Sequence, residues 1–294
     1  MPQEAWPELP YEAWKDSLET LHMVTQIVGK LRLALSPFEP QWQNVPLYLT
    51  ARGLTTTPIS SGPQIFQVDI DLIGHEVLLL TTRGDLRRIT LTARPVAEFY
   101  RDFLASLGSL GIEVEISPRP SEVPDPIQFA EDTTHSAYDP AWVRRFFDVL
   151  SRIDIVFKEH RAPFRGKTSL VNFFWGTFDL ALTRYSGRAV KPPAGAGVIM
   201  RKGADAEVIC SGFWPGSARV PAPNFFGYAA PAPPGIEKEA VRPAGAHWDP
   251  AIKEFLLPYD EVRKAASPRR EILDFCESVY AAGARLARWD EALI

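Results

Sequence analysis

Hydrophobic residues recur at intervals of three and four in four long segments of the chain. In the first segment, which follows Pro10, the apolar positions from Trp14 to Leu35 form one continuous stripe. The other three segments begin with residue types that are favoured at helix starts: Pro95, Asp139-Pro140 and Ser267-Pro268. The pattern therefore predicts four amphipathic helices.

Shorter segments between these helices alternate apolar and polar residues, as β-strands do. The alternation is cleanest where Phe66, Val68 and Ile70 are separated by polar side chains. Glycine and proline residues separate the segments, which favours antiparallel hairpins and short loops. The predicted strands are Leu47–Ala51, Ile65–Leu72, Glu76–Thr82, Leu86–Leu91 and an edge strand Ile112–Ile116, then Phe173–Tyr185, Glu207–Phe213, Asn224–Ala229 and Lys253–Leu257.

The order helix, four strands, helix thus occurs twice. We predict an α+β fold of two similar units with mainly antiparallel sheets, residues 1–138 and 139–294, either as two units or as one compact pseudo-duplicated domain. Residues 1–140 carry a net charge of −9 and residues 141–294 a net charge of +5. The two halves either dock on each other or the basic half holds an anion. The proline-rich stretch 189–250 predicts long surface loops that could cover a cleft.

Composition excludes several classes of protein. The 294 residues are 46% hydrophobic, enough for a well-filled core, yet no apolar run approaches the roughly 18 to 20 residues of a membrane helix. The net charge of −4 offers no electrostatic footprint for nucleic acid. The amino terminus lacks the basic start of a secretory signal, and Cys210 and Cys276 are expected to be buried free thiols. We expect a soluble cytoplasmic protein that binds neither nucleic acid nor membrane.

Common catalytic and cofactor motifs are absent from the sequence. Gly166-Lys167-Thr168 resembles the end of a phosphate-binding loop, but Arg161 stands where the earlier glycine belongs. The five histidines are scattered, which argues against zinc, and no Gly-x-Ser-x-Gly elbow exists. No cofactor is predicted. The possibility that stays open is a divalent ion held by carboxylates such as Asp69, Asp71, Asp179 and Glu207.

The segment from Phe173 to Arg188 places five aromatic residues, one carboxylate and two arginines in what reads as a buried strand. In a single strand, Trp175, Asp179, Thr183 and Tyr185 face one side and line a cavity, whereas Phe174, Phe178, Leu180 and Leu182 face the core. Arg184 falls on the core side, where a guanidinium needs a partner. We predict Glu207 of the next strand as that partner.

An arginine and a carboxylate that converge beside tryptophans are typical of a small-molecule site. The candidate ligand-binding residues are Trp175, Asp179, Arg184, Arg188, Glu207 and Trp214, with His135 and Tyr228 as further candidates. This combination predicts a small-molecule-binding protein, either an enzyme or a binding protein without activity, for an anionic or polar ligand. The alternative is an interaction or scaffold protein in which these ion pairs are structural.

Five segments also resemble the signature segments of a bacterial protein family known as domain of unknown function 5996. They are Phe164-x-Gly166-Lys167, Phe174-Trp175-Gly176-x-Phe178-Asp179-Leu180, Arg184-x-Ser186-Gly187-Arg188, Gly212-Phe213-Trp214-Pro215-Gly216 and Phe255-Leu256-Leu257-Pro258-Tyr259. The resemblance spans nearly the whole chain. It implies a soluble bacterial protein and brings no activity, cofactor or catalytic residue. The chain departs from the family pattern after Lys167, where Thr168-Ser169-Leu170 replaces Ser-Pro.

Overall fold

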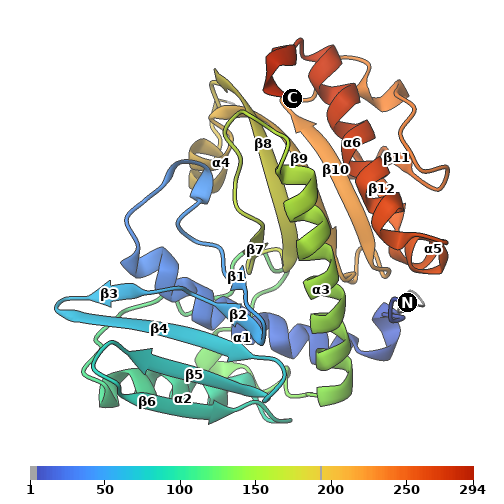
Figure 1. Ribbon diagram of the computed structural model, residues 1–294. Coiled ribbons are helices and arrows are strands. Elements are labelled where there is room, and N and C mark those ends of the chain that lie inside the picture. The colour runs from blue at the N-terminus through green and yellow to red at the C-terminus, as the bar shows by residue number, and fades with distance from the viewer. Residues whose placement is uncertain (1–4, 193) are drawn as a thin grey trace.

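Alternating buried and exposed residues build the first sheet. The computed structural model describes residues 5–192 and 194–294, and within them two six-stranded antiparallel sheets form the framework (Figure 1). In the first sheet the order is β1-β2-β4-β5-β6, with β3 paired to β4. Its strands are β1 (Tyr48–Leu49), β2 (Gly53–Thr55), β3 (Ile59–Ser61), β4 (Gln64–Asp71), β5 (Glu76–Thr81) and β6 (Leu86–Thr90). Helices α1 (Lys15–Leu35) and α2 (Val96–Ser109) belong to this half of the chain.

The second sheet has the order β11-β12-β10-β9-β8-β7. Its strands are β7 (Asn172–Phe174), β8 (Asp179–Ala189), β9 (Ala206–Trp214), β10 (Asn224–Ala230), β11 (His247–Asp249) and β12 (Glu254–Pro258). The helices of this half are α3 (Pro140–Arg161), α4 (Val198–Gly203), α5 (Tyr259–Lys264) and α6 (Pro268–Leu286). Short 3-10 turns lie at Tyr11–Ala13, Pro40–Trp42, Phe129–Glu131, Ile236–Lys238 and Glu291–Leu293.

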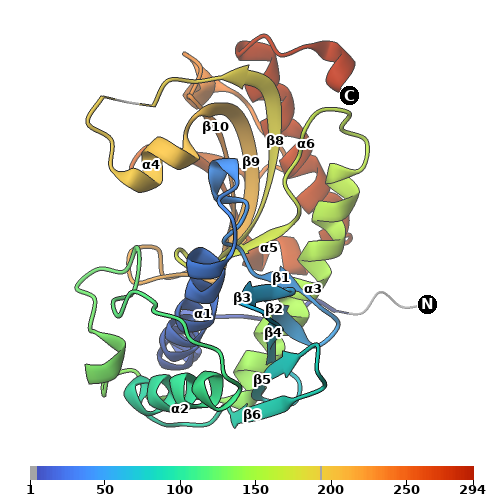
Figure 2. The same cartoon turned by 90° about the vertical axis from the view of Figure 1, so that its left-hand side faces the viewer.

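Helices cover one face of the second sheet, and other parts of the chain lie against its opposite face. Figure 2 shows α3 and α6 on one side of β8, β9 and β10, with α4 and the segment before β1 on the opposite side. Helix α6 packs closely on the sheet, because a Cβ atom at Gly227 would come within 2.9 Å of Val279. Helix α3 begins as its sequence predicts, since the Asp139 side chain accepts hydrogen bonds from the amides of Ala141 and Trp142.

The two halves share one hydrophobic core. Leu47 and Phe173 exchange backbone hydrogen bonds of 3.0 and 2.9 Å, which joins the chain just before β1 to β7. The ring of Phe178 contacts His22 of α1 and Phe146 of α3, with centroids 5.0 and 5.4 Å apart. Helix α1 is buried on most sides, and its buried residues include the polar side chains Gln26 and Lys30.

The α+β class with antiparallel sheets is confirmed. Each sheet contains two strands more than the four predicted, because very short strands such as β3 and β11 leave too little alternation to recognise. The predicted edge strand Ile112–Ile116 is wrong within the described chain. Its backbone follows the end of α2 as coil, and the amide of Ile112 donates to the carbonyl of Leu107.

The prediction of one strand from Phe173 to Tyr185 is also wrong. The segment is a hairpin in which residues 175–178 form a tight turn between β7 and β8. The turn is closed by a 2.8 Å hydrogen bond from the amide of Phe178 to the carbonyl of Phe174, and Phe178 has a positive φ of 58°. Phe178 therefore reaches the core by a left-handed turn and not by strand alternation.

Candidate functional site

The hairpin turn is fixed against helix α1 by Trp175. The indole Nε1 of Trp175 donates a 2.8 Å hydrogen bond to the carbonyl of Val45. Its ring lies directly on Gly29, where a Cβ atom would come within 2.1 Å of the ring. Glycine is therefore required at position 29, because it lets the helix backbone approach the tryptophan ring closely.

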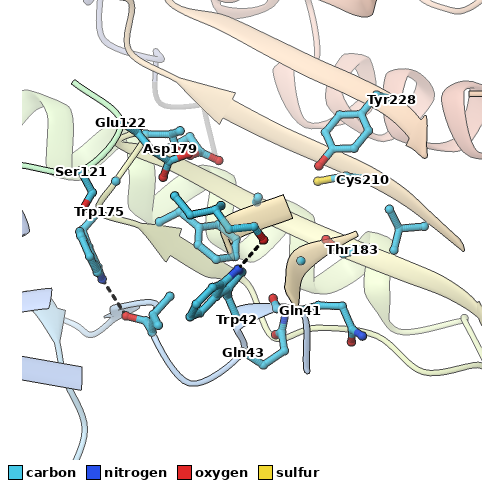
Figure 3. Close-up of a pocket in the computed structure, with 18 of the residues that line it drawn as sticks. Gln41, Trp42, Gln43, Ser121, Glu122, Trp175, Asp179, Thr183, Cys210 and Tyr228 are labelled. Atoms are coloured by element: carbon cyan, nitrogen blue, oxygen red, sulfur yellow. Dashed lines mark hydrogen bonds between the residues drawn. The ribbon is translucent and has the colours of Figure 1, made fainter. Parts of the chain in front are cut away.

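A pocket of about 310 Å³ lies on the face of the second sheet that α3 and α6 do not cover (Figure 3). Alternate residues of β8 form its floor: Asp179, Ala181, Thr183 and Tyr185. The strand pattern had predicted this for all of them except Ala181. Further walls come from β7, β9 and β10, from the segments 41–45 and 121–122, and from α4. The volume is at the small end of the range typical of ligand sites.

Helix α4 lies over the pocket and is attached to the segment before β1. The indole nitrogen of Trp42 donates a 2.9 Å hydrogen bond to the carbonyl of Ile199, and the side chain of Gln41 donates to Asp205 at 2.5 Å. Gln41 and Trp42 both have a φ of 57°, so this segment adopts an unusual backbone conformation. The stretch 189–250, expected to form long loops, contains α4, which contributes Ile199 and Gly203 to the lining.

Two carboxyl groups lie at one end of the pocket. Asp179 is only 7% exposed, and its Oδ1 accepts a hydrogen bond from the hydroxyl of Thr177. Burial raises the pKa of Asp179 to about 7; the hydrogen bond from Thr177 opposes this rise and the negative charge of Glu122 adds to it. Partial desolvation also raises the pKa of Glu122, although this residue is exposed. Figure 3 shows both side chains at the same end of the pocket.

Glu122 is held against the hairpin turn. Its φ is 60°, and its Oε2 lies 2.4 Å from the position that a Cβ atom would take at Gly176. The missing side chain at Gly176 thus makes room for the Glu122 carboxylate. Among the described residues, neither Glu122 nor Asp179 forms an ion pair. The pocket therefore contains two neighbouring acids without a cationic partner.

Cys210 and Tyr228 form the adjoining part of the sheet wall. Burial raises the pKa of the Cys210 thiol to about 12. The neighbouring Cys210 and burial raise the pKa of Tyr228 well above its ordinary value. Both groups stay protonated near neutral pH, so Cys210 is a poor nucleophile and both side chains act as neutral hydrogen-bonding walls.

The structure brings only some of the predicted site residues together. Trp175 and Asp179 line the pocket, and so does Tyr228. Trp214 does not belong to the lining, but its ring stacks on that of the lining residue Phe226, with centroids 4.9 Å apart. His135 lies outside the lining and pairs with Asp132 at 2.7 Å.

Arg184 lies on the other face of the sheet and does not enter the pocket. It is 1% exposed, donates to the carbonyl of His160 and lies 3.4 Å from Glu277 of α6. Its guanidinium also lies over the ring of Tyr280 at 4.5 Å. The predicted partner Glu207 is therefore wrong. A strand pattern shows on which face Arg184 lies but not which helix covers that face.

Glu207 instead pairs with Arg188 near the end of β8, at 2.9 Å between Nε and Oε2. Arg188 is half exposed and also donates to the carbonyl of Ala287 at 2.7 Å. Neither residue belongs to the pocket lining. The ion pair joins the end of β8 to β9, and the hydrogen bond to Ala287 joins it to the end of α6.

Several pocket residues carried no sequence signal: Gln41, Trp42, Gln43, Ser121, Glu122 and Thr177. Most lie in loops without periodic patterning, and only the tertiary fold brings them to β8. The charge of Glu122 did not indicate a binding site, because acidic residues in a proline-rich connection are usually solvated.

The carboxylates considered for a divalent ion do not converge. Within the described part of the chain, no group of three or more His, Cys, Asp or Glu residues is arranged to hold a metal. Asp71 instead pairs with Arg52 at 2.6 Å, while Asp69 accepts a 2.8 Å hydrogen bond from the side-chain Nε2 of Gln67.

Comparisons with known proteins identify the family only. Among the described helices, none is both long and apolar enough to cross a membrane. Neither the search of curated proteins nor the search of solved structures gave a match. The family model described as "Family of unknown function (DUF5996)" matches residues 6–294. Because this match covers nearly the whole sequence, the chain belongs to that family.

Proposed function

We propose that this protein binds a small organic molecule that has an apolar or aromatic body and a positively charged or hydrogen-bond-donating group. The observation that carries the proposal is the pair Asp179 and Glu122, a buried acid and an exposed acid at one end of an aromatic pocket, neither of which forms an ion pair among the described residues. Buried charge is costly unless it is paired, so the site is prepared for a ligand that supplies the missing positive charge.

The charge of the lining favours a cation over an anion. Glu122 and Asp179 are the charged side chains among the described lining residues, and the arginines first considered lie elsewhere. A carboxylate or phosphate ligand would face two acids without a guanidinium to receive it. An ammonium or amidinium group gains hydrogen bonds and charge pairing from the same two acids.

The rest of the lining suits a flat or apolar body. Rings of Trp42, Phe174, Tyr185 and Phe226 border the cavity. Aromatic walls of this kind bind rings by stacking and attract cations through their faces. Thr183 and Gln43 add neutral polar groups that can orient a ligand.

We place this binding in the bacterial cytoplasm. The family resemblance supports a bacterial source, and the two cysteines support a reducing compartment, because both are buried and free.

Protonation of Asp179 makes the proposed binding depend on pH. A cation binds the ionised carboxylate, and the pKa of Asp179 in the empty pocket is about 7. We therefore expect the affinity for an ammonium ligand to increase as the pH rises towards 7, by up to about tenfold for each pH unit. Above pH 7 the affinity should level off, because Asp179 is then ionised. Binding near pH 6 should release a proton, which calorimetry in two buffers of different ionisation enthalpy measures directly.

A thermal-shift screen with matched ligands tests the proposal. Benzylamine, benzamidine and tryptamine are compared with carboxylates of similar size, benzoate and indole-3-acetate. At 100 times its dissociation constant a ligand adds about 2.7 kcal/mol of stability. We expect the amines to raise the melting temperature and the carboxylates to leave it unchanged.

Matched variants locate the binding. Glu122→Gln and Asp179→Asn should weaken the response to the amines, whereas Asp69→Asn, in the other sheet and outside the pocket, should not. Stabilisation by the carboxylates alone, or an amine response that survives both pocket substitutions, would contradict the proposed function.

A further inference from the structure

A serine of the pocket lining meets a lysine of α1. Ser121 lines the pocket, and its Oγ lies 3.0 Å from Nζ of Lys30 on α1. This is the distance at which a nucleophile and its general base exchange a proton. The two residues are far apart in the sequence, so neither drew attention as a motif.

The position of Ser121 is fixed by Gln26. Its side-chain amide donates to the carbonyl of Ser121 at 2.7 Å, and its carbonyl accepts from the amide of Ser121 at 2.9 Å. Gln26 and Lys30 lie one turn apart on the same face of α1. One helix face therefore holds both the backbone and the hydroxyl of Ser121.

Lys30 has an unusual environment for a lysine. It is 2% exposed and forms no ion pair within the described residues. Its Nζ lies 5.5 Å from the ring centroid of Trp175 and 6.0 Å from that of Phe129. Burial lowers the pKa of Lys30 to about 8, so about a tenth of the side chain is the neutral amine at pH 7.

We propose that Ser121 is a nucleophile activated by Lys30, and that the pocket catalyses acyl transfer from a small ester, thioester or amide. The assignment rests on the proposed function in that the same pocket must admit a small molecule. The acids Glu122 and Asp179 then bind the positive or donor group of the substrate, while Ser121 meets its carbonyl carbon.

The reaction balances with these groups and water. The neutral amine of Lys30 takes the Ser121 proton as Oγ bonds to the carbonyl carbon. The bond from that carbon to the leaving group breaks, and the Lys30 ammonium gives the proton to the leaving group. Water then attacks the acyl-serine and loses one proton to Lys30. Ser121 departs as the alkoxide and receives that proton back, which releases the carboxylic acid.

Donors for the developing oxyanion are available in the lining. Gly176 and Thr177 line the pocket, and within the described chain their amides donate no hydrogen bond. The carbonyls of Trp175 and Gly176 face α1 instead, where they contact Nε2 of His22 at 2.9 and 3.1 Å. Unpaired backbone amides of this kind stabilise tetrahedral intermediates.

Covalent labelling tests the dyad in the full-length protein. The probes are an alkyl fluorophosphonate and p-nitrophenyl acetate, followed by intact mass and peptide mapping. We expect one adduct per chain at Ser121, with a labelling rate that rises with pH and a midpoint near 8. Ser121→Ala should abolish the adduct, whereas Ser109→Ala, on the exposed part of α2, should not affect it.

The role of Lys30 needs a readout that a structural role does not change. Lys30→Met should slow labelling about 100-fold or more, in line with loss of a general base. Small primary amines should restore part of the rate to Lys30→Ala, which a purely structural lysine does not predict. If these variants fail to fold, the pH profile and adduct site of the wild-type chain still decide the matter.

The outcomes separate the two proposals. Folded wild-type protein that binds the aromatic amines but gives no Ser121 adduct with either probe overturns the dyad and leaves the binding function standing. An adduct at Ser121 with a rate independent of pH between 6 and 9 overturns the role of Lys30. A Ser121 adduct in a protein that responds to no amine overturns the ligand class and supports the dyad.

Discussion

The substitution Asp179→Asn should stabilise the protein at neutral and alkaline pH. Asp179 is almost fully buried, and its pKa in the folded protein rises from an ordinary 3.8 to about 7. At about 1.4 kcal/mol for each pKa unit, the rise corresponds to a penalty of about 4 kcal/mol for the ionised folded protein. Asparagine keeps the acceptor for Thr177 and removes the charge. Its own amide costs part of the gain, so we expect a net stabilisation of about 1 to 3 kcal/mol.

The sign of the pH dependence follows from the raised pKa. Between pH 4 and 7 the folded protein holds a proton on Asp179 that the unfolded chain has lost, so the free energy of unfolding falls as pH rises. Above pH 7 both states have lost the proton and the penalty is complete. The Asp179→Asn variant has no carboxyl group to ionise here, so its free energy of unfolding does not fall in this way. Its stability advantage over wild type should therefore be absent at pH 4 and full at pH 8.

Thermal unfolding at pH 4.5, 6 and 8 measures the effect. For a chain of this length about 1 kcal/mol corresponds to roughly 2 °C, so the variant should melt about 2 to 6 °C above wild type at pH 8. The matched control is Asp69→Asn on β4, which should show no such pH-dependent gain. A variant that is less stable than wild type at pH 8, or a difference that does not change with pH, would refute the reasoning.

Three further substitutions or treatments follow from the packing. Arg184→Ala should destabilise the fold by about 3 kcal/mol and leave amine binding intact, whereas Arg188→Ala, in a half-exposed pair, should cost less than about 1 kcal/mol; equal losses in denaturant unfolding would count against the buried role. Gly29→Ala should displace Trp175 and lower the melting temperature, whereas Gly108→Ala, in open space on α2, should be neutral or stabilising; unchanged tryptophan fluorescence in the first variant would contradict the contact. Cys210 and Cys276 should react slowly with a thiol reagent in the native protein, because burial raises the pKa of each to about 12. Rapid labelling of either cysteine in the native protein would show that its side of the sheet is more open than the structure indicates.

The sequence predicted the framework and one wall of the pocket. Alternation along β8 correctly placed Asp179, Thr183 and Tyr185 on the face that lines the cavity. It also placed Arg184 on the core side, where it is 1% exposed. Both predictions rest on the two-residue repeat of a strand, which does not depend on what packs against it.

The rest of the site depends on tertiary contacts that no local pattern reports. Glu277 reaches Arg184 from α6, so the partner could not be inferred from neighbouring strands. Ser121 and Glu122 occupy a loop that is positioned by the side-chain amide of Gln26 on α1, which hydrogen-bonds to the backbone of Ser121. The turn after Phe174 was missed because Gly176 also fits a bulge in a continuous strand.

The contact between Trp175 and Gly29 has a consequence for synthesis of the chain. Trp175 emerges from the ribosome about 150 residues after Gly29, which at 5 to 20 residues per second is roughly 7 to 30 s later. During that interval the face of α1 that carries Gln26 and Lys30 has no hairpin to cover it. The nascent first half therefore presents an unfinished surface, suited to transient capture by a chaperone, and the pocket is created only when the second half arrives.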